Sequence, residues 1–332
     1  MKIENRNALA CYGEWPSPDL IISDGAYGVG GFPGDPLDPS AIAEWYLPHI
    51  RAWTQYAKPS TSLWFWNTEI GWANVHPVLV ANGWDYVETI VWDKGKSHIA
   101  GNVNSKTIRQ FPVATEVSAL YRRKVFFPSE DGAAMTAQVW LRSEWQRSGV
   151  PLYKANEACG VRNAATRKYL TQDHLWYWPP GSAVEAMAEY LNRNGLPTAK
   201  PYFSLDGKTP ICAKDWDGLR ATWNHVHGYT NVWSRPQLGG KERLKKNGSN
   251  IAFLHLNQKP IEFMEMQILA ASNEGDVVWE PFGGLGSASL ASVMNGRDAY
   301  YAEIIETYYN AAKLRLMYSN DPAEANIIRK AG

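Results

Sequence analysis

Short apolar runs alternate with helix-like stretches in the first 127 residues and again from Asn257 onward, and this alternation limits the possible folds most. Strands that alternate with helices form mostly parallel sheets with helices on both faces. We therefore expect an α/β fold with a doubly wound, mostly parallel sheet. The expected strands span 19–23, 62–66, 86–92, 116–121, 276–280 and 299–303. The expected helices span 40–53, 71–81, 260–274, 287–295 and 307–317.

Residues 128–250 lose this alternation and gain Pro, Gly and basic residues. We expect them to form an insertion that divides one α/β domain into residues 1–127 and 251–332. A chain of 332 residues is long enough for one large domain that carries such an insertion. Hydrophobic residues make up 45% and charged residues 20% of the chain, which excludes extensive disorder.

Net charge and cysteine content exclude several classes of protein. The 33 Lys and Arg residues balance the 33 Asp and Glu residues, so nucleic-acid binding requires local basic patches. Cys11, Cys159 and Cys212 are too widely spaced for a disulfide framework or a zinc site, which favours the reducing cytoplasm.

The N-terminus lacks an apolar signal core, and no apolar run is long enough to span a bilayer, so we expect neither export nor membrane insertion.

Glycines at 283, 284 and 286 separate the expected strand 276–280 from the following helix. Glycine lets a ligand approach the backbone closely, and Glu303 at the next strand end can accept hydrogen bonds from both ribose hydroxyls. These residues predict a site for a nucleoside cofactor. A dinucleotide is the less suitable ligand, because Ser289 stands where the third glycine of that fingerprint belongs.

A second group of residues, Asp24-Gly25-Ala26-Tyr27, directly follows the apolar run 19–23. Asp24 and the Gly25 carbonyl could each accept one hydrogen of an exocyclic amine, while Tyr27 stacks on an extruded base. A simple turn at the end of a strand would also favour Asp and Gly. A third group, His255 to Pro260, precedes a helix whose N-terminus suits the carboxylate of a methionine-like ligand or an ordinary cap.

These segments together resemble the amino-methylating DNA methyltransferases, which use S-adenosylmethionine. Residues 257–316 resemble the C-terminal segment of that family, and residues 3–29 resemble the segment with its Asp/Ser/Asn-Pro-Pro-Tyr/Phe motif. Residues 61–67, 88–96 and 111–124 are similar as well. The order of catalytic motif, insertion and cofactor motif is that of the β group. The resemblance implies a Rossmann-like sheet with circularly permuted motifs and an inserted target-recognition region.

The resemblance also implies roles for individual residues. Phe282 and the three loop glycines would wrap the cofactor, Glu303 would bind its ribose, and Lys259 would lie near its methionine end. Asn7 falls where many members place an acidic residue near the adenine, and Glu280 replaces the commoner Asp. The complete set implied for the cofactor is Asn7, Asp24, Lys259, Glu280, Phe282, Gly283, Gly284, Gly286 and Glu303. The set implied for catalysis is Asp24, Gly25, Ala26 and Tyr27, in which Gly25 and Ala26 replace two prolines.

The expected reaction is methyl transfer to an exocyclic amine of double-stranded DNA, which requires neither a metal nor a covalent enzyme intermediate. The lack of a Pro-Cys dipeptide at a comparable position argues against methylation of cytosine C5. Asp24 at the first motif position favours adenine N6, with cytosine N4 as the alternative.

A nicotinamide-dependent oxidoreductase would leave residues 24–27 unexplained. A DNA-binding protein with a degenerate catalytic motif is a further alternative, because Gly25 and Ala26 replace prolines.

Two basic segments are candidates for DNA contact. Residues 153–159 and 163–170 outline a helix-turn-helix, although two ordinary packed helices fit the same pattern. Residues 239–249 form a basic stretch that suits either phosphate contact or a solvated loop. The candidate residues are Arg162, Arg167, Lys168, Lys241, Arg243, Lys245 and Lys246.

Overall fold

A computed structural model describes residues 1–99, 107, 109–129, 134–160, 162–163, 165–225, 228–239, 242–244, 254–255 and 257–317. Residue contacts divide the chain into two compact units. Unit 1 comprises Met1–Arg123 and Ala221–Gly332, and unit 2 comprises Lys124–Arg220. Within the part of the chain that is described, no helix is long and apolar enough to cross a membrane.

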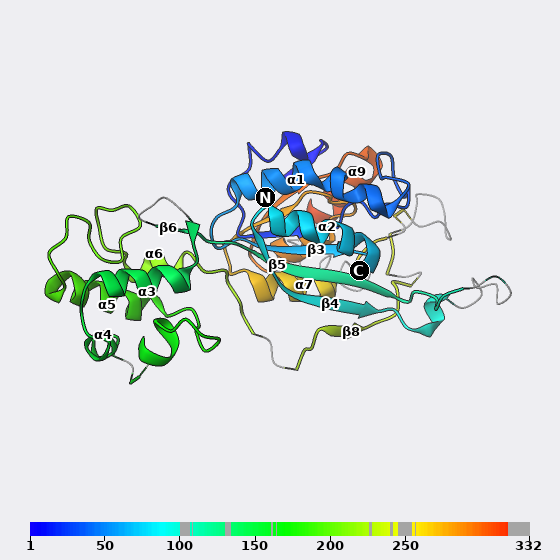
Figure 1. Ribbon diagram of the computed structural model, residues 1–332. Coiled ribbons are helices and arrows are strands. Elements are labelled where there is room, and N and C mark those ends of the chain that lie inside the picture. Colours follow the sequence, from blue (N-terminus) through cyan, green and yellow to red (C-terminus); the bar gives the residue numbers. More distant parts are fainter. Residues whose placement is uncertain are drawn as a thin grey trace. The chain divides into compact units, whose positions relative to one another are not determined.

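Unit 1 contains an eight-stranded sheet with the strand order β1-β10-β9-β2-β3-β5-β4-β8. Figure 1 shows β3, β5, β4 and β8 side by side in this order. β5 runs antiparallel to both of its neighbours, whereas all the other strand pairings in this sheet are parallel. The predicted α/β fold with a mostly parallel sheet is therefore confirmed. The strands are β1 (Lys2–Glu4), β2 (Leu20–Ser23), β3 (Ser62–Asn67), β4 (Trp84–Asp93), β5 (Thr115–Arg123), β8 (Val232–Ser234), β9 (Val277–Glu280) and β10 (Asp298–Ala302).

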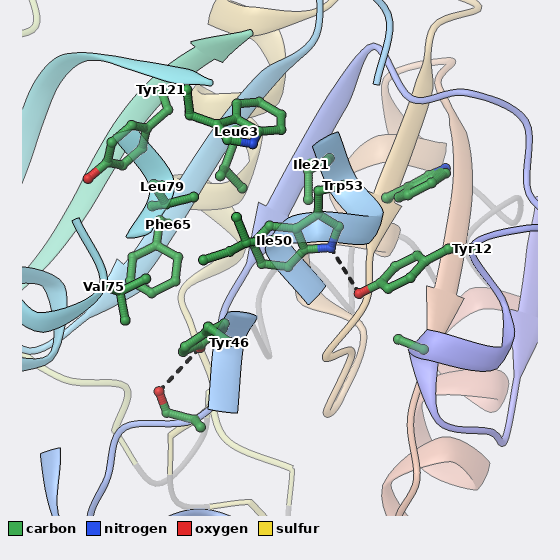
Figure 2. Packing of buried hydrophobic residues seen from close by; sticks show 14 of the residues in the cluster. Tyr12, Ile21, Tyr46, Ile50, Trp53, Leu63, Phe65, Val75, Leu79 and Tyr121 are labelled. Carbon is green, nitrogen blue, oxygen red and sulfur yellow. Dashed lines mark hydrogen bonds between the residues drawn. The ribbon is translucent and has the colours of Figure 1, made fainter. Parts of the chain in front are cut away.

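Both faces of the sheet are covered by helices because successive side chains of each strand point to opposite faces. On β3, Leu63 and Phe65 pack with α1 (Ile42–Tyr56) and α2 (Glu69–Ala81), a core shown in Figure 2. Trp64 and Trp66 instead pack with α7 (Ile261–Ala271) and α8 (Ser287–Met294). The last helix described is α9 (Glu306–Met317), which contacts α8. Three short 3-10 helices are η1 (Ala8–Ala10), η2 (Pro39–Ala41) and η3 (Lys96–Ile99).

The second boundary of the insertion differs from the sequence prediction. The compact unit 2 ends at Arg220 rather than at 250. After it, β8 pairs with β4 in the large sheet through Val91–Val232, Trp92–Trp233 and Asp93–Ser234. A three-residue strand is too short to produce a recognisable periodicity, which is why neither β8 nor β1 was predicted.

Unit 2 is mostly helical and has its own core, which includes Trp140, Leu141, Val184, Met187 and Trp216. Its helices are α3 (Ala137–Arg147), α4 (Leu152–Ala158), η4 (Ala165–Tyr169), α5 (Gly181–Asn194) and α6 (Ala213–Asp217), and β6 (Phe127–Pro128) pairs with β7 (Ala134–Met135). The predicted second helix of the helix-turn-helix is only this five-residue π-helical stretch η4. Asn163 has a left-handed backbone with φ 58°, which does not continue into a regular helix from that residue. The helix-turn-helix prediction is therefore wrong in its second helix.

Candidate active site

The predicted site residues of unit 1 meet at one edge of the sheet. Asp24 follows β2, the loop 281–286 follows β9, and Glu303 follows β10. These three strands are parallel neighbours, so their carboxyl ends share one edge, where ligands bind in open α/β sheets. A cavity of about 340 Å³ lies there, and its lining includes Asn7, Asp24, Gly25, Tyr27, Phe282, Gly284 and Glu303.

Asp24 is held by two donors on one of its two carboxylate oxygens. Its Oδ1 accepts hydrogen bonds from the Lys259 ammonium at 2.8 Å and from the Tyr27 hydroxyl at 2.8 Å. Within the described part of the chain, no residue donates to Oδ2 of Asp24. Since Asp24 lines the cavity, this second oxygen is the one that remains for a ligand.

The Tyr27 hydroxyl lies between the carboxylates of Asp24 and Glu116, and its single hydrogen is shared between them. Burial raises the pKa of Tyr27 well above its usual value, and the charges of Asp24 and Glu116 add to this effect. The phenol therefore remains protonated. The predicted stacking of its ring on a base stays a prediction.

Lys259 and Glu116 form the buried centre of a charge network. The Lys259 ammonium is within 2.8 Å of both Asp24 Oδ1 and Glu116 Oε1, and its side chain is 3% exposed. Lys94 binds the other Glu116 oxygen at 2.8 Å. Burial opposes ionisation of Glu116, but the two ammonium groups outweigh it and lower the pKa of Glu116 to about 2.

Neither Lys94 nor Glu116 was predicted as a site residue from the sequence. The available signal was an acidic residue at the first position of a predicted buried strand, which is costly to bury unless it is paired. Lys259 was predicted near the methionine end of a cofactor, and the structure adds its ion pairs with Asp24 and Glu116.

The glycine loop after β9 leaves no room for a side chain at Gly283, where a Cβ would lie 1.8 Å from the Tyr301 ring. In the loop after β2, a Cβ on Gly25 would lie 2.6 Å from the ring of Phe282. Gly284 and Gly286 have left-handed backbones with φ 51° and 71°. Glycine is required where the backbone approaches this closely or takes positive φ.

Glu303 and Glu280 are both buried carboxylates, but they contact different parts of the fold. Glu303 accepts hydrogen bonds from the backbone N–H groups of Gly284 at 2.8 Å and Ile305 at 2.7 Å, and it lines the large cavity. Glu280 instead accepts hydrogen bonds from the backbone N–H groups of Ala288 at 2.9 Å and Ser289 at 2.7 Å. It therefore caps the N-terminus of α8. Glu280 also lines a small adjoining cavity with Lys259, and its direct contact with a cofactor stays a prediction.

Phe282 and Asn7 form part of the wall of the large cavity. The ring of Phe282 lies against Trp45 and His49, with centroid distances of 5.3 and 4.8 Å. Asn7 caps η1 by accepting a hydrogen bond from the N–H of Leu9 at 2.9 Å. Asn7 therefore has a structural task besides the predicted contact with adenine.

The predicted DNA-contacting residues fall into three groups. Arg162, Arg167 and Lys168 are exposed on unit 2, in and before η4. Arg243 is half-buried in unit 1, and burial lowers the pKa of its guanidinium. The remaining candidates lie outside the described residues, namely Lys241, Lys245 and Lys246.

Two known methyltransferases match part of the chain. The orphan methyltransferase M.BamHII of Bacillus amyloliquefaciens is 37% identical over 86 residues, which are 26% of this chain and 31% of that protein. The type II methyltransferase M.HinfI of Haemophilus influenzae is 35% identical over 86 residues, 26% of this chain and 23% of that protein. The chain thus matches less than a third of the length of these two relatives.

Solved structures share the fold at low sequence identity. The complex of M1.HpyAVI with SAM is 14% identical with a TM-score of 0.51, covering 95% of this chain and 98% of the other. The cytosine-N4-specific PvuII DNA methyltransferase is 12% identical with a TM-score of 0.52, covering 99% of this chain and 92% of the other. Finally, the model of the N6/N4 DNA methylase family matches residues 18–314. Because this match spans most of the 332 residues, the chain belongs to the DNA methylase family.

Proposed function

We propose that this protein is an S-adenosylmethionine-dependent DNA methyltransferase that methylates the exocyclic amine of a flipped base, with adenine N6 favoured. The observation that supports this proposal most is one cavity lined jointly by Asp24, the glycine loop and Glu303. A carboxylate for the base and a nucleoside-type site thereby face the same space. If the protein were a nicotinamide-dependent oxidoreductase, the position of Asp24 in this cavity would be unexplained.

The residues around the cavity fit S-adenosylmethionine. Glu303 presents a carboxylate for the ribose hydroxyls, and Phe282 and Tyr308 supply ring surfaces on the same cavity. Among the described residues, a Cβ built on Gly284 would have only the His255 ring within 4 Å, so the backbone is open to a ligand there. When bound, S-adenosylmethionine would supply a methyl group activated by its positively charged sulfur.

Asp24 and its neighbours would prepare the amine of the base. The amine is a poor nucleophile because its lone pair is delocalised into the ring. A hydrogen bond to the remaining Asp24 oxygen, and one to the Gly25 carbonyl, would favour a pyramidal nitrogen with a directed lone pair. Lys259 and Tyr27 hold the other Asp24 oxygen, so the carboxylate is oriented before the base arrives.

Double-stranded DNA is the proposed partner. Arg162, Arg167 and Lys168 on unit 2, and Arg243 on unit 1, supply positive charge for phosphates or guanine edges. Residues 124–220 would then act as the target-recognition unit.

The test is transfer of tritiated methyl groups from S-adenosylmethionine to mixed-sequence double-stranded DNA, followed by hydrolysis to nucleosides. We expect the label in N6-methyladenine. Label in N4-methylcytosine would support the alternative base within the same proposal. Absence of label from DNA, with S-adenosylmethionine binding intact by calorimetry, would favour a degenerate DNA-binding protein and contradict the proposal.

A further inference from the structure

The catalytic motif of this chain lacks the two prolines of the motif that it resembles. Proline restricts the backbone through its ring, whereas Gly25 and Ala26 leave the peptide free to take more conformations. A flexible motif would orient Asp24 poorly, because catalysis requires reacting groups to be held in place. The structure must therefore fix this backbone by other means if the motif is active.

Asn67 holds the carbonyl side of the motif. Its Nδ2 donates a hydrogen bond to the Ala26 carbonyl at 2.8 Å, and the side chain is fully buried at the end of β3. The Oδ1 of Asn67 accepts from the N–H of Thr68 at 3.0 Å, which fixes the orientation of the amide. Tyr46 on α1 adds a second hydrogen bond to the Ala26 carbonyl at 3.2 Å, drawn in Figure 2.

Asp35 holds the amide side of the same segment. Its Oδ1 accepts hydrogen bonds from the N–H groups of Tyr27 at 3.1 Å and Gly28 at 2.9 Å. Its Oδ2 accepts from Gly31 at 2.8 Å and Val29 at 3.3 Å. The residue is 8% exposed and lines the large cavity. Hydrogen bonds to an ionised acceptor are stronger than neutral ones, so four of them fix residues 27–31 firmly.

The close approach of Phe282 explains why side chains perform this task. A Cβ on Gly25 would lie 2.6 Å from the Phe282 ring and 2.7 Å from the Tyr46 hydroxyl, so a proline does not fit there without movement. The hydrogen bonds of Asn67 and Asp35 to residues 26–31, here called the clamp, fix the backbone instead. They leave the space beside Gly25 to the rings of Phe282 and Tyr46.

We propose that Asp35 and Asn67 are positioning residues that take over the task of the missing prolines. They act through the backbone of residues 26–31 on Asp24 and Tyr27. This inference rests on the proposed methyl transfer, because it concerns the geometry of that reaction.

The test compares the isosteric variants Asp35→Asn and Asn67→Asp with the wild type. Asp35→Asn replaces one acceptor oxygen by a donor, and Asn67→Asp replaces the donor that holds Ala26 by an acceptor. We expect the turnover rate of methyl transfer to fall about tenfold or more, with the affinity for S-adenosylmethionine changed less than about threefold. In the Asp35 variant we also expect faster hydrogen exchange at the amides of Tyr27, Gly28 and Gly31.

Two matched controls change the same groups elsewhere. Asp38→Asn alters the exposed carboxylate that accepts from Ser40, and Asn82→Asp removes an Nδ2 bond to the Val78 carbonyl at the end of α2. We expect both controls to keep normal turnover.

The outcomes separate the inference from the proposed function. Unchanged amide exchange in Asp35→Asn would overturn the clamp itself. Faster exchange with unchanged turnover would overturn its positioning role and leave the clamp structural. The wild-type protein could also methylate no DNA while Asp35→Asn still speeds hydrogen exchange at the amides of residues 27, 28 and 31. This result would overturn the proposed function, and the positioning role with it, but not the clamp.

Discussion

Charge compensation around Asp24 is the main feature of the site at the scale of residues. Two ammonium groups, Lys94 and Lys259, face two carboxylates, Asp24 and Glu116, and three of these four side chains are at most 12% exposed. Buried ion pairs persist only while each charge keeps its partner, because desolvation of a lone charge is costly. Glu116 is shared by both ammonium groups, so it is the residue on which this balance depends most.

We predict that Glu116→Gln lowers the free energy of unfolding by about 3 kcal/mol, the usual cost of breaking a buried ion pair. Urea denaturation at neutral pH measures this change. The matched control is Glu157→Gln, which breaks the exposed pair with Lys154. We expect the control to leave the free energy of unfolding nearly unchanged, because solvent screens an exposed ion pair. Equal losses in the two variants would contradict the buried network.

At the scale of elements, the start of α8 depends on a residue of the preceding strand. Gly286 at the helix N-cap has no side chain, and the carboxylate of Glu280 binds the N–H groups of Ala288 and Ser289 instead. Burial raises the pKa of Glu280 to about 7, although these hydrogen bonds favour the charged form. The folded protein thus holds the Glu280 proton at pH values where the unfolded chain, with a pKa of about 4.3, has lost it.

This difference predicts a pH dependence with a definite sign. Between about pH 5 and 7 the folded state binds more protons at Glu280, so ionisation destabilises it as the pH rises. The free energy of unfolding of the wild type minus that of Glu280→Gln should fall by about 1 kcal/mol per pH unit in this range. A flat or rising difference for Glu280 would contradict its assigned environment.

The elements that were predicted from the sequence share a strong local signal. The core strands β2, β3, β9 and β10 are continuous apolar runs, and the loops after β2 and β9 contain glycines at strand ends. Their common edge follows from parallel pairing, which is how Asp24 and Glu303 could be placed together. Glu116 and Asn67 could not be placed, because their partners Lys259 and Ala26 belong to distant segments of the sequence. Asp35 binds nearby amides, but it lies in an irregular loop, for which the sequence shows no periodicity. The prediction of a second helix in the helix-turn-helix was wrong, because the local sequence pattern does not reveal the left-handed backbone at Asn163.

At the scale of the whole molecule, the chain leaves the α/β unit after Arg123 and returns to it at Ala221. Unit 2 has its own hydrophobic core, so its surface can vary without changing unit 1. Under the proposed function, unit 1 would perform the reaction and unit 2 would select the DNA.

We predict that changing Arg162, Arg167 and Lys168 together to Gln weakens binding to double-stranded DNA. Each lost phosphate contact should reduce the slope of log K against log salt concentration by about 0.9. Fluorescence anisotropy at several salt concentrations measures this slope. The control is a triple Gln variant of exposed basic residues elsewhere on unit 2, namely Arg193, Lys208 and Lys214. If both triple variants give the wild-type slope, the predicted contacts are wrong.

The central claim is that one cavity holds both the methyl donor and the base, with Glu303 on the first and Asp24 on the second. The most direct test measures S-adenosylmethionine affinity and DNA methylation for Asp24→Asn and Glu303→Gln in parallel. We expect Asp24→Asn to keep its affinity and lose about a hundredfold or more in turnover. Glu303→Gln should lose affinity and recover turnover at high S-adenosylmethionine concentration. Near-normal turnover of Asp24→Asn, or unchanged affinity of Glu303→Gln, would contradict the account.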